Sequence, residues 1–285
     1  MFATLSAANC QLSLSPARMG AFHAHFKTTS DRECLGAMMW HHAIASSAWP
    51  LISVVEICLR NRSHHAMSAL YGNVKSREWY RGGPNDMRLK GGIQGRITEL
   101  LCRTDDAGNK VVNSIDEFIA ATTFGTWVGV LQQLPSDRRF RFTKMAFPEY
   151  PMLLDKQAWT APAKTWLPLI ERLERHKSFR DRIAHHAPIW NFPYAPHEGE
   201  KRIKPASAGA TIISLRQEIQ HLRTSLVEME PGLVDFWDGT AQQEALETLT
   251  TLASLNHYMG RDLSPPEAGL ATTGTAAHTA LKAAE

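Results

Sequence analysis

The sequence predicts an all-α protein, and three observations support this prediction. Apolar residues recur at the i, i+3, i+4, i+7 spacing of one helix face in several segments. The strict alternation of apolar and polar residues that marks a half-buried strand is nearly absent. Glycine, proline and helix-capping residues separate the periodic segments. We therefore expect a single all-α domain over residues 1–260, followed by a flexible C-terminal tail over residues 261–285.

The clearest helix is predicted over residues 50–71. Pro50 fits its first turn, where the missing N–H removes no hydrogen bond. Gly72 provides a stop, because glycine readily adopts the left-handed conformation that ends many helices. Residues 40–49 are expected to form a separate helix that leads into this one. The apolar face of helix 50–71 comprises Leu51, Val54, Val55, Cys58, Leu59 and Ala66.

Five further helices are predicted along the rest of the chain. Asn113 or Ser114 caps the second of them with a short polar side chain. A turn over residues 104–110 and a polar, proline-containing loop over residues 193–209 connect neighbouring helices. The five helices cover about residues 93–102, 114–131, 164–186, 211–229 and 241–258.

Composition narrows the class of protein. With 285 residues, of which 44% are apolar, the chain builds a sizeable core, which excludes disorder as its main state. No run reaches the roughly 18–20 uninterrupted apolar residues typical of a membrane span, and the N-terminus does not resemble a secretion signal. The four cysteines lie far apart without a CxxC pair, which indicates a reducing compartment. We expect a cytoplasmic protein with no membrane partner.

Basic residues gather in several stretches, although the net charge is only +3. One stretch interleaves Phe140 and Phe142 with basic residues, which suits phosphate contact and base stacking. A solvated helix end whose phenylalanines face the core is the interpretation that we favour. The loop over residues 193–209 also suits contact with RNA or a partner, and a surface linker is its plainer interpretation. The basic residues concerned are Arg138, Arg139, Arg141 and Lys144 in the first stretch, and Lys201, Arg202 and Lys204 in the loop.

The run RDRIAHHAPIWN, which starts at Arg180, combines residue types suited to RNA cleavage. Pro188 disfavours helical geometry in the residue before it, so the preceding helix is expected to end at about His185 or His186. A histidine there lies at the negative end of the helix dipole, which favours its charged form. An arginine that neutralises phosphate charge and a histidine that exchanges protons near neutral pH are what metal-free RNA cleavage needs.

A second copy of the R-x4-H spacing runs from Arg60 to His65, inside the helix predicted over residues 50–71. In that helix Glu56, Arg60 and His64 share one face at i, i+4 spacing. We interpret this trio as an internal polar network that supports the core.

Three separated motifs resemble those of one protein family. The run AHHAPIWN resembles the signature of the Abi-like (abortive infection) proteins of the AbiD/AbiF type, in which an arginine, a polar residue and later Ala-His-His precede Trp-Asn. VEICLRNR, with the following YG and WY pairs, resembles the family's N-terminal helix, and FIAATTFGTWVGVL resembles its central helix. The motifs occur in the expected order over residues 40–192. The resemblance implies a domain of the HEPN superfamily, that is, a HEPN-like helical bundle with additional helices.

The resemblance also implies an activity, that of a metal-independent endoribonuclease in bacterial anti-phage defence or a toxin–antitoxin system. The family's R-x4-H motif falls on Arg180 and His185 as catalytic residues, with Asp181 and His186 as supporting residues. His185 would exchange protons as the RNA 2′-hydroxyl attacks the adjacent phosphate, and Arg180 would neutralise transition-state charge. Asp181 replaces the commoner asparagine, and its charge repels a phosphate unless it pairs with Arg180 or Arg182. Ala187 stands where the family pattern often has an acidic residue.

The implied partners follow from this chemistry. They are an RNA substrate, a second copy of the chain in a C2 homodimer that joins two motifs in one cleft, and an antitoxin protein or a regulatory small RNA as restraint. Neither a metal nor a cofactor is expected. A catalytically inactive HEPN module that binds RNA or a partner protein is the alternative, and a purely structural motif is the third possibility.

Other chemistries lack their motifs. The sequence contains no HExxH, GxGxxG or GxxxxGK[ST], so zinc-protease, dinucleotide-binding and P-loop functions have no support. Histidine pairs such as His41-His42 have no cysteine or carboxylate at ligand spacing, which favours a structural or solvent-facing role.

Overall fold

The computed structural model describes residues 14–71, 78–81, 86–196 and 200–261. In this part of the chain, eleven α-helices and three short 3-10 helices accompany one two-stranded antiparallel sheet, which confirms the all-α class. The expected stop at Gly72 and the expected tail, apart from Arg261, lie outside the described residues.

The helical elements are α2 (Pro16–Phe26), α3 (Asp31–Leu70), α4 (Gly91–Leu100), α5 (Ile115–Ala121), α6 (Phe124–Gln132), α7 (Ser136–Ala146), α8 (Trp166–Ala184), α9 (Ala208–Met229), α10 (Pro231–Asp238), α11 (Ala241–Leu249) and α12 (Leu252–Met259). The 3-10 helices are η1 (Pro151–Leu154), η2 (Gln157–Thr160) and η3 (Pro162–Lys164), and the strands are β1 (Cys102–Thr104) and β2 (Lys110–Val112).

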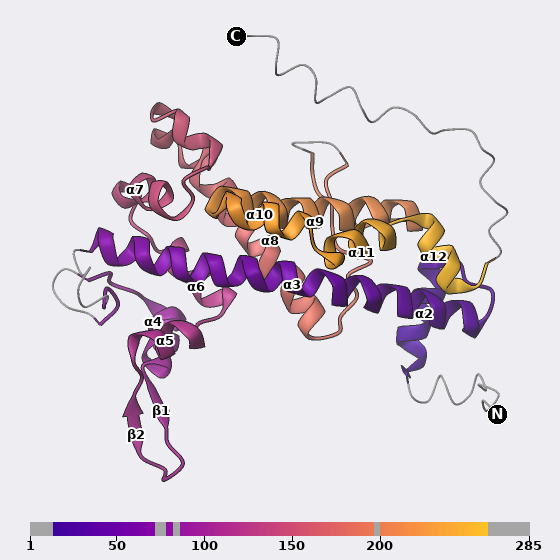
Figure 1. Cartoon of the computed structure of the whole chain (residues 1–285), viewed down its shortest axis with the longest axis horizontal. Coiled ribbons are helices and arrows are strands. Elements are labelled where there is room, and N and C mark those ends of the chain that lie inside the picture. The colour runs from indigo at the N-terminus through magenta and orange to yellow at the C-terminus, as the bar shows by residue number, and fades with distance from the viewer. Residues whose placement is uncertain (1–13, 72–77, 82–85, 197–199, 262–285) are drawn as a thin grey trace.

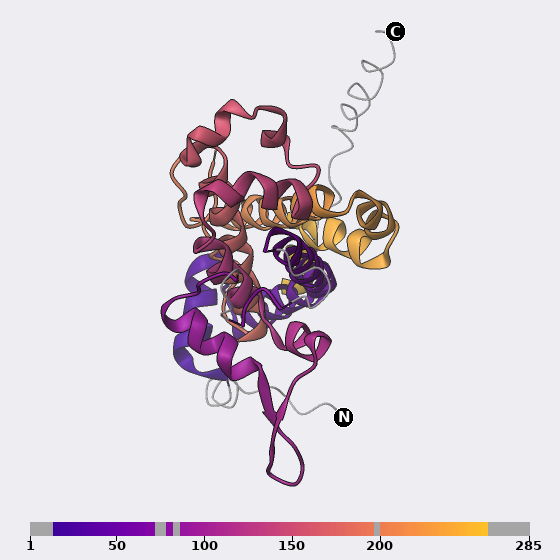
Figure 2. The ribbon, with the colours of Figure 1, turned by 90° about the vertical axis from the view of Figure 1, so that its left-hand side faces the viewer.

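The 40-residue helix α3 runs through the middle of the molecule, and α2, α7, α9, α11 and α12 pack on it (Figures 1 and 2). The expectation of two helices divided at Pro50 is wrong, because Pro50 lies inside α3. A proline inside a helix costs about 3 kcal/mol through its lost hydrogen bond. The burial of apolar side chains before and after Pro50 outweighs this cost. The residues fully buried in the core on the two sides of Pro50 include Trp40, Ile44, Leu51 and Val55.

By length and composition alone, α3 is long and apolar enough to cross a membrane, and it is the one such helix in the described part of the chain. The core helix of a soluble protein passes the same test. Here one face of α3 packs its apolar side chains into the core against the surrounding helices, while Met39, Trp49 and Ile57 on the same helix are exposed.

Two helices that were predicted as continuous are each divided at a Thr-Thr pair. The segment over residues 114–131 forms α5 and α6, which are separated by Thr122-Thr123. The segment over residues 241–258 forms α11 and α12, which are separated by Thr250-Thr251. In both pairs the first hydroxyl donates to a carbonyl of the helix that ends, and the second hydroxyl caps the helix that begins.

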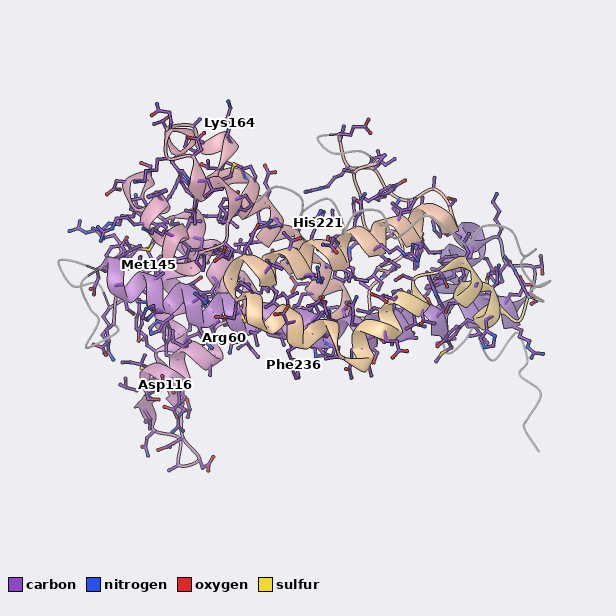
Figure 3. All side chains as sticks on the ribbon, turned by 45° about the horizontal axis from the view of Figure 1, so that its top comes forward. Arg60, Asp116, Met145, Lys164, His221 and Phe236 are labelled. Atoms are coloured by element: carbon purple, nitrogen blue, oxygen red, sulfur yellow. The ribbon has the colours of Figure 1, made fainter. Side chains whose placement is uncertain are left out.

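The predicted turn over residues 104–110 joins β1 to β2 in a hairpin that projects from the helical body (Figure 1). The hairpin is followed by Ser114, which forms a capping box with Glu117 at the start of α5. Asp116, in the first turn of α5, lies near the base of the hairpin (Figure 3). The capping predicted from Ser114 is therefore confirmed.

The basic stretch over residues 138–144 lies on α7 and follows the interpretation favoured above only in part, because Phe140 is half-buried rather than in the core. Phe142 is buried in the core. Arg138 donates to the Leu70 carbonyl at the end of α3, and Arg139 donates to the Leu134 carbonyl. These two guanidinium groups are thus used in satisfying backbone carbonyls at helix ends.

A buried ionic cluster joins α8 to α9. The Glu218 carboxylate accepts hydrogen bonds from Arg175 and from His176 Nδ1, and His176 Nε2 lies 2.9 Å from the Ser225 hydroxyl. Although burial raises the pKa of Glu218, the hydrogen bonds and charges of its partners outweigh burial and hold that pKa well below its usual range. The cluster fixes α8 against α9 and so determines where the end of α8 lies.

We expect Gly36→Ala to destabilise the protein strongly. A Cβ atom at Gly36 would lie 2.1 Å from the Tyr258 carbonyl oxygen, so α12 would have to move away from α3. Such overpacking costs about 1–3 kcal/mol or more. Gly20→Ala on α2 is the matched control, because a Cβ there meets no atom within 4 Å. It should raise stability by about 0.5–1 kcal/mol. Denaturant unfolding of both variants tests this, and equal stabilities would contradict the close approach of α3 and α12.

Candidate active site

The Arg180–His185 motif lies at the C-terminal end of α8, beside the middle of α3. Helix α8 ends at Ala184, and His185 is its C-cap, close to the expected end. His186 follows with a φ angle of 52°, in the left-handed region. The N–H of His186 donates to the Ile183 carbonyl, and the N–H of Ala187 donates to the Arg182 carbonyl. These two bonds form a Schellman motif, in which histidine takes the position that glycine usually occupies.

Arg180 connects three helices through its neighbours. Its Nε donates to a carboxylate oxygen of Glu56 on α3, at 3.3 Å. The other Glu56 oxygen accepts the Phe124 N–H at the start of α6, at 2.8 Å. The Arg180 guanidinium also lies 5.8 Å from the centre of the Trp49 ring. About a quarter of the Arg180 side chain (26%) remains exposed, so the group is anchored and still reaches solvent.

The charge of Asp181 is compensated by two cations. Lys177 donates to one Asp181 oxygen at 2.7 Å, and Arg180 Nη1 lies 3.4 Å from the other. The pairing with Arg180 meets the condition under which Asp181 does not repel a phosphate. Arg182, the other partner considered from the sequence, instead donates to the Pro188 carbonyl and to Asn191.

The two histidines of the motif are exposed, and a cavity of about 410 Å³ opens beside them. His186 lines this cavity opposite His42 and Trp49 of α3, and the rings of His42 and His186 lie 6.3 Å apart. Ala184, which immediately precedes His185, also lines it. Burial, followed by the charges of His186 and Arg18, lowers the pKa of His42. The site thus combines a cation, several imidazoles and a half-exposed indole.

Contacts from α2 and α3 hold the segment after the motif in place. His41 Nε2 accepts the Ile189 N–H at 3.0 Å, and Arg18 donates to the His186 carbonyl at 2.6 Å. The Trp190 ring packs against His25 at 4.3 Å between ring centres. Sequence reasoning missed all of these supporting residues. The one available signal was the His41-His42 pair, which lies two helical turns before Trp49 on the same helix.

The trio Glu56, Arg60 and His64 lies along α3 (Arg60 is labelled in Figure 3), and its first member pairs outside the trio. Glu56 binds Arg180, so it links the two stretches that the sequence singled out. His64 Nδ1 accepts the Trp79 indole N–H at 3.1 Å. His65, the histidine of the second R-x4-H spacing, is exposed.

No group of three or more histidine, cysteine, aspartate or glutamate side chains is arranged to hold a metal ion in the described ranges.

No family model, curated protein or solved structure matches this chain. The resemblance to the Abi-like proteins therefore stays a prediction from the sequence motifs.

We expect His186→Gly to stabilise the protein by about 0.5–1 kcal/mol. The left-handed conformation costs a non-glycine residue about 1–2 kcal/mol, and glycine avoids this cost. Part of the gain is offset because glycine loses more conformational entropy on folding. His186→Val should instead destabilise it, since a β-branched side chain fits this conformation worst. Thermal melts of the two variants test the geometry, and the reverse order of stabilities would contradict it.

Stability should fall in mild acid because of His41. Burial, together with the charges of His42 and Arg18, lowers the pKa of His41 to about 3 from an ordinary value near 6.5. Between about pH 6.5 and pH 3, His41 is therefore protonated in the unfolded chain and neutral in the folded protein. The contribution of His41 to the free energy of unfolding is complete above pH 6.5. It falls by about 1.4 kcal/mol per pH unit as the pH drops toward 3.

The measurement compares the free energy of unfolding of the wild type and His41→Gln at pH 7.5 and pH 5. The advantage of the wild type should shrink by about 2 kcal/mol at the lower pH. His257→Gln, which changes an exposed histidine on α12, serves as the control and should leave the pH dependence unchanged. A constant difference for His41→Gln would show that His41 takes up its proton normally.

Proposed function

We propose that this protein is a metal-independent endoribonuclease that cleaves single-stranded RNA at the Arg180–His185 motif. The observation that carries the proposal is that Trp49, a 39% exposed indole, lines one cavity with His42 and His186 and also lies 5.8 Å from the anchored Arg180 guanidinium. The exposed His185 follows directly after Ala184, which lines the same cavity. Cations suit phosphates, indoles suit the faces of unstacked bases, and imidazoles suit proton transfer. The motif resemblance noted in the sequence supports the same activity.

Each group has a role in this proposal. His185 removes the proton of the RNA 2′-hydroxyl, whose oxygen attacks the adjacent phosphorus. Arg180, oriented by Glu56, neutralises the negative charge that builds on the phosphate oxygens in the transition state. The bond from phosphorus to the 5′-oxygen of the next nucleotide breaks, and that oxygen takes up a proton. The products are a 2′,3′-cyclic phosphate and a 5′-hydroxyl end, so DNA is not a substrate.

The leaving oxygen needs a second proton-transfer group. We propose that His185 of a second copy supplies it in a C2 homodimer, so that base and acid come from different protomers. The compensated Asp181, supported by Lys177, keeps the approach to Arg180 open to an anion. The biological setting we propose is a cytoplasmic abortive-infection or toxin–antitoxin system, in which an antitoxin protein or a small RNA restrains the activity.

A catalytically inactive RNA-binding module of the same fold is the second candidate. The observation that favours it is the ion pair between Arg180 and Glu56, which already neutralises the arginine. The two functions differ in whether RNA is cut after it binds.

His185→Ala should reduce the rate of RNA cleavage by about 100-fold or more, since a positioned general base contributes about 10²–10⁴. Arg180→Ala should cost about 10²–10³ through lost charge stabilisation. The assay follows a labelled RNA strand and tests for a 2′,3′-cyclic phosphate end, with an all-deoxy strand and added chelator as further conditions. The deoxy strand should stay intact, and the chelator should have no effect.

His65→Ala is the matched control, because it removes the exposed histidine of the second R-x4-H spacing, which lies near the C-terminal end of α3. It should leave cleavage unchanged. Cleavage that survives in His185→Ala would overturn the role of His185 as general base. A wild type that binds RNA and never cuts it would overturn the nuclease in favour of the binding module. Thermal melts confirm that each variant is folded.

A further inference from the structure

A second cavity, of about 560 Å³, lies between α8 and the segment that follows the motif. One wall consists of α8 residues spaced three and four apart, which therefore share a helix face. The opposite wall includes Phe192 and Arg202. Arg175 of the buried ionic cluster and Asp181 of the motif line this cavity, to which no ligand has been assigned above.

Arg175 gives this cavity a buried cationic donor without a matching acceptor. Its side chain is only 5% exposed, and its Nε donates to Glu218 in the cluster between α8 and α9. Its Nη2 is buried and has no hydrogen-bond partner among the residues that the structure describes. A charged donor left unpaired in the interior is costly, so an acceptor from outside the described residues is needed to satisfy it.

Two further arginines gather at the same place. The guanidinium groups of Arg175 and Arg182 lie 4.5 and 5.1 Å from the centre of the Phe192 ring. Arg202 is brought to the cavity by the paired backbones of Tyr194 and Ile203, which exchange hydrogen bonds of 2.9 and 2.8 Å. Burial lowers the pKa of Arg175, the charge of Glu218 partly raises it again, and the charge of Arg202 lowers it further. Arg175, Arg182 and Arg202 thus line one cavity together with the Phe192 ring.

The remaining groups identify the kind of anion. Glu171, Glu174 and Asp181 also line the cavity, so its formal charges balance and a bare inorganic anion is a poor fit. A ribonucleotide combines a phosphate with hydroxyl and amino donors, and it therefore suits a cavity that offers both guanidinium groups and carboxylates. Asp181 also accepts from Arg180, so the cavity adjoins the candidate active site.

We propose that this cavity binds one ribonucleotide unit of the RNA strand, next to the unit that is cleaved, with its phosphate against Arg175 and Arg202. The carboxylates along α8 accept hydrogen bonds from its sugar or base. This inference rests on the proposed function for the identity of the strand, and the residues that hold the nucleotide are separate from Arg180 and His185.

The experiment measures binding of a fluorescein-labelled single-stranded RNA of about 12 nucleotides, a length within the usual footprint of such sites. All proteins carry His185→Ala, so that the strand is not cut. Adding Arg202→Gln should weaken binding about fivefold or more, and should lower the slope of log K against log salt by about 0.7, the value for one lost phosphate contact on a single strand. Arg202→Lys, which keeps the charge, should recover most of the affinity.

Lys204→Gln is the matched control, because Lys204 is an exposed base two residues away that does not line the cavity. It should change affinity less than twofold. Equal losses of RNA affinity in Arg202→Gln and Lys204→Gln, or an unchanged salt slope in Arg202→Gln, would overturn the inference. Whether the protein is a nuclease would still be tested separately by the cleavage assay. If RNA binding depends on Arg202 and the wild type never cuts the RNA, the nucleotide-binding cavity would be supported and the nuclease would be ruled out.

Discussion

The carboxylate of Glu56 ties together the three helices on which the candidate active site is built. It projects from α3 and accepts one hydrogen bond from the free N–H at the start of α6 and another from Arg180 on α8. A nearly buried carboxylate is tolerated only where such partners replace water. The start of a helix also carries partial positive charge, which suits an anion. The position of Arg180 over Trp49, and therefore of the whole motif, depends on this contact.

Local sequence signals predicted most of the fold. The periodic segments became helices, Ser114 became a cap, and the turn over residues 104–110 became the tip of a hairpin. Helices α2 and α10 were not predicted at all. The errors at Pro50 and at the Thr-Thr pairs share one physical origin, which is that the outcome depended on competing contacts. Pro50 reads as a helix start by itself, yet burial on both sides of it keeps α3 continuous. The sequence predicts the Thr-Thr pairs to lie inside helices. In the structure their hydroxyls form hydrogen bonds at the ends of the two neighbouring helices.

In the candidate site too, the residues that are neighbours in the sequence were predicted, and the contacts between distant residues were not. The sequence singled out Arg180, His185, Asp181 and His186 because they are neighbours in one run, and it singled out Glu56 for a role in a different place. Only the packing of α3 against α8 brings Glu56 to Arg180, and only α2 and α3 supply Arg18, His41 and His42. Contacts between residues more than 120 positions apart leave no pattern in a single sequence. The proposed function rests on the motif resemblance together with this geometry.

The first half of α3 packs against elements that come last in the described chain, and this order has a consequence for biosynthesis. The Trp40 indole donates to the Leu249 carbonyl across 209 positions, and Glu33 pairs with Arg261 across 228. During translation the apolar face of α3 emerges first, while α11 and α12 are still to be made. A nascent chain therefore exposes this face to solvent and chaperones until almost the last described residue has left the ribosome. The bundle therefore completes its folding only once α11 and α12 have been synthesised, because both pack on its central helix.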